Sequence, residues 1–130
     1  AIIMPIEVGM DVVSRAIKQS SKHIILLDGF PPTFEYAIEF EKLTKRDTGV
    51  TLVGAIEVFV EKEVATERVL QRSRTDDERS IFEKRYQRYI QNAVTLNDWY
   101  SKNYKFHSID GCQTIEASIK SVEAHILSDI

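Results

Sequence analysis

Residues 24–34 read IILLDGFPPTF, in which a short apolar run stops at an aspartate, a glycine, an aromatic residue and a pair of prolines. A continuous apolar run of this length is typical of a strand that is buried on both faces of a parallel sheet. We therefore predict a strand over residues 24–28 that ends on Asp28, followed by a turn that Pro31 holds in place. A carboxylate at the end of a buried strand is costly unless a cation or hydrogen-bond donors face it, so Asp28 is a candidate functional residue.

Strand-like and helical patterns alternate along the rest of the chain. Apolar and β-branched runs predict two further strands, over residues 55–60 and 105–109. Thr75 and Glu78 fit a capping box at the start of the longest helical pattern. The alternation predicts an α/β fold in three layers, with a parallel sheet of three strands and helices on both of its faces. The predicted helices cover residues 5–20, 33–46, 63–73, 75–102 and 114–127.

Composition narrows the class of protein. A chain of 130 residues, 43% of them hydrophobic, is long enough for one core and short for two, so we predict a single domain over residues 1–130. The formal net charge of −3 argues against a general nucleic-acid binder, and no apolar run approaches the roughly 18–20 residues that span a bilayer. Cys112 is the one cysteine, so we expect a reducing, cytoplasmic location and neither a membrane nor a nucleic-acid partner.

Ligands of parallel sheets bind at the carboxyl ends of the strands, where Asp28-Gly29 and Asp110-Gly111 are expected. Two interpretations of Asp28 remain open. Its carboxylate could hold Mg²⁺ through water beside phosphate groups, as in P-loop nucleotide enzymes. It could equally accept hydrogen bonds from the backbone amides of the turn that begins at Gly29.

A basic cluster lies at the end of the helix predicted over residues 63–73. Arg68 and Arg72 are four residues apart and therefore share a face, where their charges repel by roughly 0.2–0.5 kcal/mol. A bound anion would remove this repulsion, and the guanidinium groups of Arg68, Arg72 and Arg74 match phosphate oxygens well. Glu63 and Glu67 could instead neutralise the cluster on a solvated face, and both interpretations stay open.

Asp76 and Asp77 follow the arginines directly. Two acidic residues in the first turn of a helix are favoured by the helix dipole alone, but they could also hold arginines in place around a phosphate. Arg85 lies eleven residues after Arg74, close to three helical turns, and could reach back toward the same anion.

Four segments resemble adenylate kinases and other nucleoside monophosphate kinases, in the order in which that family has them. ILLDGFP resembles the family's strand-turn motif, and ATERVLQRSRTDDERSIFEKRYQRY resembles the lid and the helix after it. HSIDGCQTIEASI resembles the last strand and helix, and IIMPIEV resembles the end of the monophosphate-binding region. The resemblance covers nearly all of the 130 residues and implies the P-loop kinase fold.

The resemblance implies a role for each candidate residue. Asp28 matches the aspartate that orients Mg²⁺ through its waters, and Arg68 and Gly111 match positions that face the bound ATP. ATP and Mg²⁺ are therefore the implied cofactors, and a short lid is implied around residues 72–77, with Ser73 where a glycine is usual. The implied catalytic residues are Arg72, Arg74, Asp76, Asp77 and Arg85, and the implied substrate-binding residues are Met4, Gly29 and Tyr36.

The sequence departs from the family at three places. The family turn reads DGFPR and its arginine binds the acceptor phosphate, but here that position is Pro32. The glutamine that usually reads the acceptor base is Tyr36. No GxxxxGK[ST] phosphate loop occurs in the chain. In the family the strand before that loop lies between the strands that match residues 24–28 and 55–60, so we expect both to have open edges.

Two hypotheses of function follow. In the first, the chain is the greater part of a nucleoside monophosphate kinase that transfers phosphate from ATP once the remainder of a longer chain supplies the phosphate loop and central strand. In the second, it is a degenerate kinase-like module that serves as a docking domain in a larger assembly, such as a ciliary multidomain protein. The retained arginines favour the first hypothesis, and Pro32, Tyr36 and the absent loop favour the second. Under either hypothesis we expect the 130 residues alone to be inactive.

Overall fold

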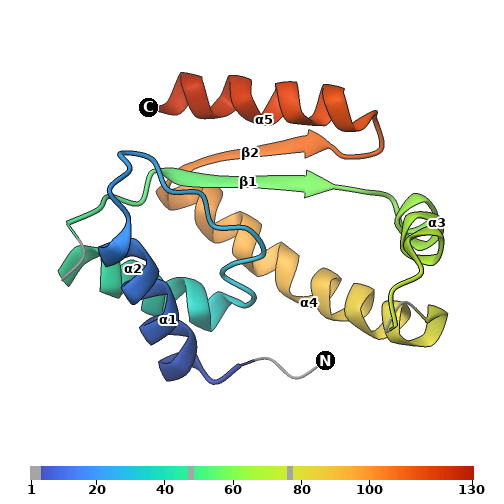
Figure 1. The fold of residues 1–130 in the computed structure, drawn as a ribbon, viewed down its shortest axis with the longest axis horizontal. Helices are drawn as coiled ribbons and strands as arrows, with labels where there is room; N and C mark the ends of the chain where they lie inside the picture. The colour runs from blue at the N-terminus through green and yellow to red at the C-terminus, as the bar shows by residue number, and fades with distance from the viewer. Residues whose placement is uncertain (1–3, 47–48, 76–77) are drawn as a thin grey trace. The chain divides into compact units, whose positions relative to one another are not determined.

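The computed structural model describes residues 4–46, 49–75 and 78–130, and the chain divides into two compact units, Ala1–Leu52 and Val53–Ile130. Figure 1 shows the elements in chain order. The first unit contains α1 (Ile6–Gln19) and α2 (Phe34–Arg46). The second unit contains β1 (Gly54–Phe59), α3 (Lys62–Arg72), α4 (Arg79–Asn103), β2 (Lys105–Asp110) and α5 (Ile115–Asp129). All of the predicted helices are therefore present.

In the first unit, α1 and α2 pack against each other. The buried side chains at their contact are Ile17 of α1 and Tyr36, Ala37 and Phe40 of α2. An ideal Cβ atom placed on Gly9 would lie 2.6 Å from Cε1 of Tyr36, so only a glycine lets the tyrosine ring approach α1 this closely. The ring of Phe30 meets the rings of Tyr36 and Phe40 edge-on, with centroids 5.7 and 5.3 Å apart.

The predicted strand over residues 24–28 is wrong. The segment has no regular secondary structure, and its apolar side chains at Ile24 and Leu26 are 47% and 69% exposed. A strand exists only where a neighbouring strand pairs with its backbone, and the part of the chain that the structure describes offers this segment no such neighbour. Asp28 is consequently exposed rather than at the end of a buried strand.

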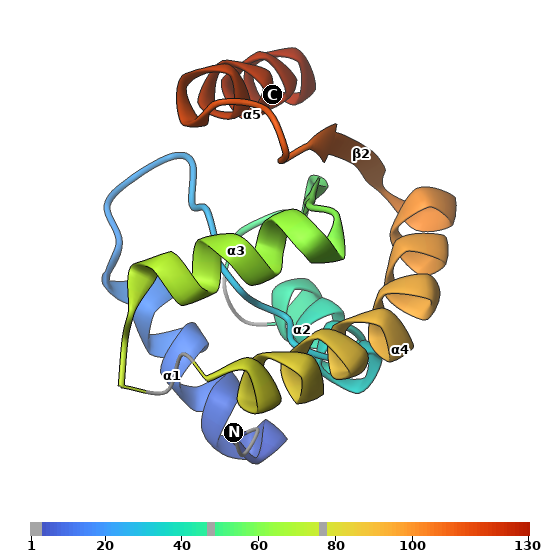
Figure 2. The ribbon, with the colours of Figure 1, turned by 90° about the vertical axis from the view of Figure 1, so that its right-hand side faces the viewer.

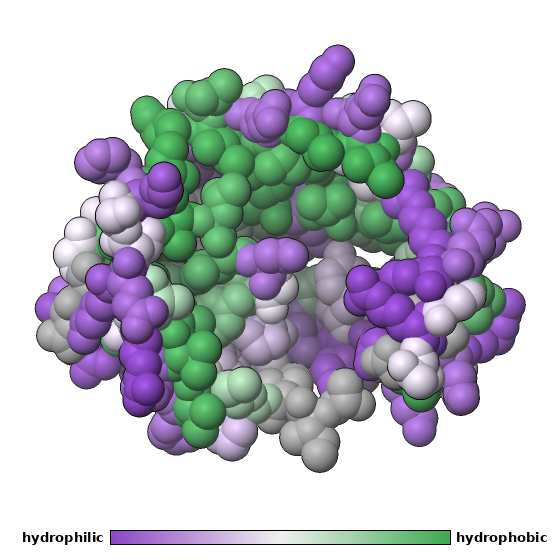
Figure 3. Space-filling view, viewed as in Figure 1, coloured by the Kyte–Doolittle hydropathy of each residue, from purple (hydrophilic) through white to green (hydrophobic). Residues whose placement is uncertain are grey.

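The second unit is built on a parallel pair of strands, which confirms two of the three predicted strands. β1 and β2 pair in register from Gly54 opposite Lys105 to Phe59 opposite Asp110. The strand pair is connected through α3 and α4, and Figure 2 shows α3 beside the first turns of α4, with which it is in contact. Figure 3 shows mostly hydrophilic side chains over α3.

Helices cover both faces of this strand pair, as predicted. Alternate side chains of a strand point to opposite faces. Glu57 of β1 and Ser108 of β2 face α4, because Glu57 accepts hydrogen bonds from Tyr89 and Asn97 of that helix as well as from Ser108. The neighbouring β2 residue, His107, faces α5 and bonds to Asp129 at 2.8 Å.

The start of α4 differs most from the sequence prediction. The capping box predicted from Thr75 and Glu78 does not form, because α4 begins only at Arg79 and Glu78 is its N-cap without a side-chain capping bond. The last helix is capped as its sequence suggests, since the hydroxyl oxygen of Thr114 accepts from the amide of Ala117 at 3.2 Å. Among the described residues, no helix combines the length and apolar character needed to cross a bilayer.

Candidate functional site

A pocket of about 290 Å³ lies between α3 and α4 of the second unit. Its cationic walls are Arg72 in the last turn of α3 and Arg85 in the second turn of α4. Arginines that line one pocket from two helices are suited to a multiply charged anion, because each guanidinium presents a fork of N–H donors that matches phosphate oxygens. The other lining residues are Val69, Phe82, Tyr86 and Tyr89.

An aromatic wall forms the α4 side of this pocket. Phe82, Tyr86 and Tyr89 recur at spacings of four and three residues, which places them on one face of the helix. Their rings contact in sequence, with centroids 5.9 Å apart for the first pair and 6.0 Å for the second. Lys62 of α3 lies over the Tyr86 ring and pairs with Glu83 at 2.7 Å, so charged contacts join the two helices beside the pocket.

Glu57 anchors the far end of the aromatic wall to the sheet. Its Oε1 accepts from the phenol of Tyr89 at 2.7 Å and from Nδ2 of Asn97 at 2.9 Å, and its Oε2 accepts from Ser108 at 2.9 Å. Burial raises the pKa of Glu57, but the three hydrogen bonds outweigh it and hold that pKa below the ordinary value. Burial, followed by the bond to Glu57, raises the pKa of Tyr89, so the phenol remains a donor.

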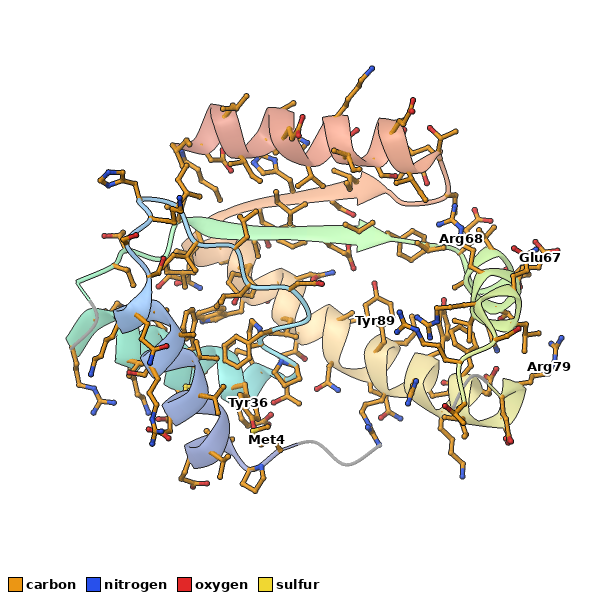
Figure 4. All side chains as sticks on the ribbon, in the orientation of Figure 1. Met4, Tyr36, Glu67, Arg68, Arg79 and Tyr89 are labelled. Atoms are coloured by element: carbon orange, nitrogen blue, oxygen red, sulfur yellow. The ribbon has the colours of Figure 1, made fainter. Side chains whose placement is uncertain are left out.

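Arg68 of α3 is directed to the loop that follows β2. Its Nη1 donates to the carbonyl oxygen of Gly111 at 2.6 Å, and its Nη2 donates to those of Cys112 and Gln113 at 3.3 and 3.4 Å. The amide of Gly111 donates to the carbonyl oxygen of Phe59 at 2.6 Å. Figure 4 shows Arg68 near the ends of the strands and Tyr89 rising from α4 toward β1.

Position 111 requires a glycine because the end of β1 approaches it closely. An ideal Cβ atom there would lie 2.6 Å from Cγ2 of Val60 and 2.8 Å from Cγ1 of Val58. The carbonyl oxygen of Phe59 would be 2.9 Å away, and this backbone atom is held in the strand. The glycine at position 111 is therefore explained by packing, whatever ligand this loop contacts.

The sequence-predicted residues of the second unit form two groups. Arg72 and Arg85 line the same pocket, and Arg68 is hydrogen-bonded to Gly111 in the loop after β2. Arg74 follows the end of α3, where Ser73 adopts a left-handed conformation with φ of 54°, and it does not line the pocket. Asp76 and Asp77 lie outside the described residues.

Sequence reasoning missed the role of the aromatic residues around the pocket. Phe82, Tyr86 and Tyr89 fit the apolar stripe of an amphipathic helix, a pattern that by itself indicates core packing rather than a site. Their position on the same helix face as Arg85 is the signal that could have found them. Glu57, a single carboxylate within an apolar strand, was a second such signal.

The remaining candidate residues belong to the first unit. The hydroxyl of the buried Tyr36 donates to the backbone carbonyl oxygen of Met4, so these two predicted substrate-binding residues are in contact (Figure 4). Gly29 has a φ of 68°, a conformation that favours glycine. The exposed carboxylate of Asp28 has the oxygen chemistry that a water-mediated Mg²⁺ ligand needs.

A parallel strand pair that is connected through α3 and α4 and covered by α4 and α5 makes this chain an α/β protein, and one pocket between α3 and α4 is lined by two arginines and an aromatic wall. A scan against models of known protein families finds no match. Individual curated proteins do match, and 69 do so with high significance. This breadth means that the similarity is to a group of proteins rather than to one of them.

Three of these relatives serve as examples, and each of them is named adenylate kinase. The chain is 35% identical over 129 residues to that of Nitratiruptor sp., which covers 98% of this chain and 66% of the relative. It is 36% identical over 122 residues to that of Campylobacter lari, covering 93% and 64%. It is 33% identical over 129 residues to that of Campylobacter hominis, covering 98% and 67%. The chain belongs to the adenylate kinase family, whose members have the P-loop kinase fold, and it spans about two thirds of the length of these relatives.

Proposed function

We propose that this chain is the greater part of a nucleoside monophosphate kinase, in which ATP and a nucleoside monophosphate give ADP and a nucleoside diphosphate. The observation that carries the proposal is that Arg72 and Arg85 line one pocket between α3 and α4. The names of the relatives support it, since they are called adenylate kinases. The two compact units would then be parts of one kinase domain.

Phosphoryl transfer needs positioning and charge neutralisation rather than covalent chemistry from the protein. Arg72 and Arg85 would bind oxygens of the transferred phosphate and stabilise the negative charge that spreads over them in the transition state. The aromatic wall would exclude water from one side of these guanidinium groups and so strengthen the attraction. Mg²⁺ with ATP would neutralise phosphate charge, and Asp28 is the residue that would hold it through water.

A phosphate loop from outside these 130 residues would complete the site. The sequence contains no GxxxxGK[ST], and the chain spans about two thirds of its relatives. Among the described residues, β1 pairs only with β2, so its second edge offers backbone donors and acceptors to a further strand. A strand added at this edge would bring the loop after it to the carboxyl end of β1.

The test is an assay of ADP formation from ATP, Mg²⁺ and AMP, UMP or CMP. We expect turnover from a longer chain that includes a phosphate loop, and none from the 130 residues alone. In the longer chain, Arg72→Lys and Arg85→Lys should each reduce kcat by on the order of a thousandfold, because lysine keeps the charge but lacks the planar fork. Arg88→Lys, on the same helix but outside the pocket lining, is the matched control and should retain activity.

A second candidate function is a degenerate module that docks other proteins. The environment of Tyr36 favours this docking function, because the tyrosine side chain is buried and its hydroxyl donates a hydrogen bond to the backbone of Met4 within the first unit. A side chain engaged in this way does not replace a glutamine that reads a base, and Pro32 supplies no charge for an acceptor phosphate. Normal folding of the longer chain without any binding of ATP would favour this function over the kinase.

A further inference from the structure

Glu57 is an unusual residue for its place in the fold. It lies in the middle of β1, between Ile56 and Val58, where a carboxylate is costly unless hydrogen bonds compensate for its lost hydration. Its three bonds come from three side chains on two other elements: Tyr89 and Asn97 of α4 and Ser108 of β2. One carboxylate therefore joins both strands to the helix that carries Arg85.

Tyr89 is the residue through which Glu57 reaches the pocket. Its ring lines the pocket with Arg72 and Arg85, while its phenol is fixed by Glu57 at 2.7 Å. The tyrosine is 37% exposed, so packing alone leaves its ring room to move. Arg85 lies four residues before Tyr89 on α4, one helical turn away on the same face. Tyr89 and Arg85 therefore line the same pocket from neighbouring turns of α4.

We propose that Glu57 is a positioning residue for the phosphate-binding pocket, which acts by holding Tyr89 against the space between Arg72 and Arg85. The inference rests on the proposed function for the identity of the ligand, a polyphosphate group. It adds to that function a residue that does not line the pocket and does not touch the anion. Because Glu57 belongs to β1, its hydrogen bond with Tyr89 fixes the tyrosine ring relative to the sheet, and under this proposal the ring in turn limits where the arginine side chains can lie.

Ser108 provides a matched control, because it also donates one hydrogen bond to Glu57 but has no side chain in the pocket. Tyr89→Phe and Ser108→Ala each remove one donor to the same carboxylate. If Glu57 only braces the fold, both variants should change stability and neither should act selectively on the pocket. If Glu57 positions the pocket, Tyr89→Phe should alter the pocket and Ser108→Ala should not.

The experiment is a nitrogen-proton NMR study of the 130-residue chain that follows the Nε–Hε signals of Arg72 and Arg85 with and without inorganic tripolyphosphate. We expect Tyr89→Phe and Glu57→Gln to shift these signals before any ligand is added. We also expect Tyr89→Phe to weaken tripolyphosphate binding about fivefold, as for the loss of one net hydrogen bond. Ser108→Ala should leave the signals and the affinity unchanged. Glu57→Gln should add no further loss of affinity when Tyr89 is already phenylalanine.

Equal effects of Tyr89→Phe and Ser108→Ala on the arginine signals would overturn the inference, as would unchanged signals in both. A further loss from Glu57→Gln in the Tyr89→Phe background would also overturn it, because Glu57 would then act by another route. Failure of tripolyphosphate to bind the unsubstituted chain would count against the proposed phosphate site. The ligand-free arginine signals would still decide whether Glu57 positions the pocket, so the two failures are distinguishable.

Discussion

Arg68 donates a hydrogen bond of 2.6 Å to the carbonyl oxygen of Gly111, which lies 43 residues further along the chain. Sequence resemblance assigns both residues to the nucleotide, and in the structure they are bonded to each other. The guanidinium of Arg68 spans the carbonyl groups of residues 111–113 and so fixes the loop at the carboxyl end of β2. Arg68 is therefore a support for that loop, whether or not it also contacts a ligand.

Arg68→Lys should loosen this loop. Lysine keeps the positive charge but has no planar fork that can reach several carbonyl oxygens at once. We expect faster hydrogen exchange of the Gly111 amide, which donates to Phe59, corresponding to a loss of about 1 kcal/mol of local stability. Arg79→Lys, in the first turn of α4, is the control and should leave this exchange rate unchanged.

Gly111→Ala should destabilise the second unit by about 1–3 kcal/mol, the usual cost of overpacking. The added methyl group would clash with Val58, Val60 and the backbone of Phe59. The measurement is the free energy of unfolding in urea. Lys120→Ala, at an exposed position of α5, should change it by less than about 0.5 kcal/mol. Equal values for Gly111→Ala and the control would mean that β1 and the loop move apart easily.

The contribution of Glu57 to stability should depend on pH. Hydrogen bonds hold the pKa of this residue in the folded chain below its ordinary value of 4.5. The stabilisation is therefore fully present above the unfolded value and is lost as the pH falls through the folded value. We expect the difference in unfolding free energy between the unsubstituted chain and Glu57→Gln to be constant near neutral pH and to shrink below about pH 4.5. A difference that stays constant down to about pH 3 would contradict this explanation.

Pro32→Arg tests the acceptor side of the proposed kinase. In a longer chain that includes a phosphate loop, the unsubstituted protein should bind ATP with Mg²⁺ but bind a nucleoside monophosphate weakly. A guanidinium–phosphate contact is worth roughly 1.5–3 kcal/mol, so Pro32→Arg should tighten monophosphate binding about ten- to a hundredfold in calorimetry. Pro32→Ala removes the same proline without adding a charge and should give no gain. Tight monophosphate binding by the unsubstituted protein would show that another residue supplies the contact.

The sequence predicted the elements whose signals are local. β1, β2 and the helices follow from composition and periodicity within each segment, and the structure has all of them. The strand at residues 24–28 was predicted wrongly because pairing depends on a neighbour that the apolar run itself does not specify. The capping box did not form because Thr75 and Glu78 have the right spacing but the helix begins at Arg79, with Glu78 as its N-cap, three residues after Thr75.

The candidate site was predictable in part. The spacing of the arginines suggested one shared anion, and Arg72 and Arg85 do line one pocket. The hydrogen bond between Tyr89 and Glu57 joins residues that are 32 positions apart in the sequence, and no local sequence pattern predicts such a pair. The carbonyl partners of Arg68 could not be predicted either, because every residue has a backbone carbonyl group and the residue type does not show which one accepts a hydrogen bond.

Among the residues that the structure describes, β1 pairs on one edge only, and its other edge has a consequence for how this chain behaves in concentrated solution. Residues 54–60 read GAIEVFV, a β-prone stretch with a single charge, and Val58 and Phe59 are 50% and 40% exposed. Such an edge is a template onto which an identical strand can add, and each addition presents a new edge. Light scattering by the isolated chain should therefore grow with protein concentration well below the unfolding temperature. A lysine in place of Val58 should suppress this growth, because repeated charges would oppose every further addition.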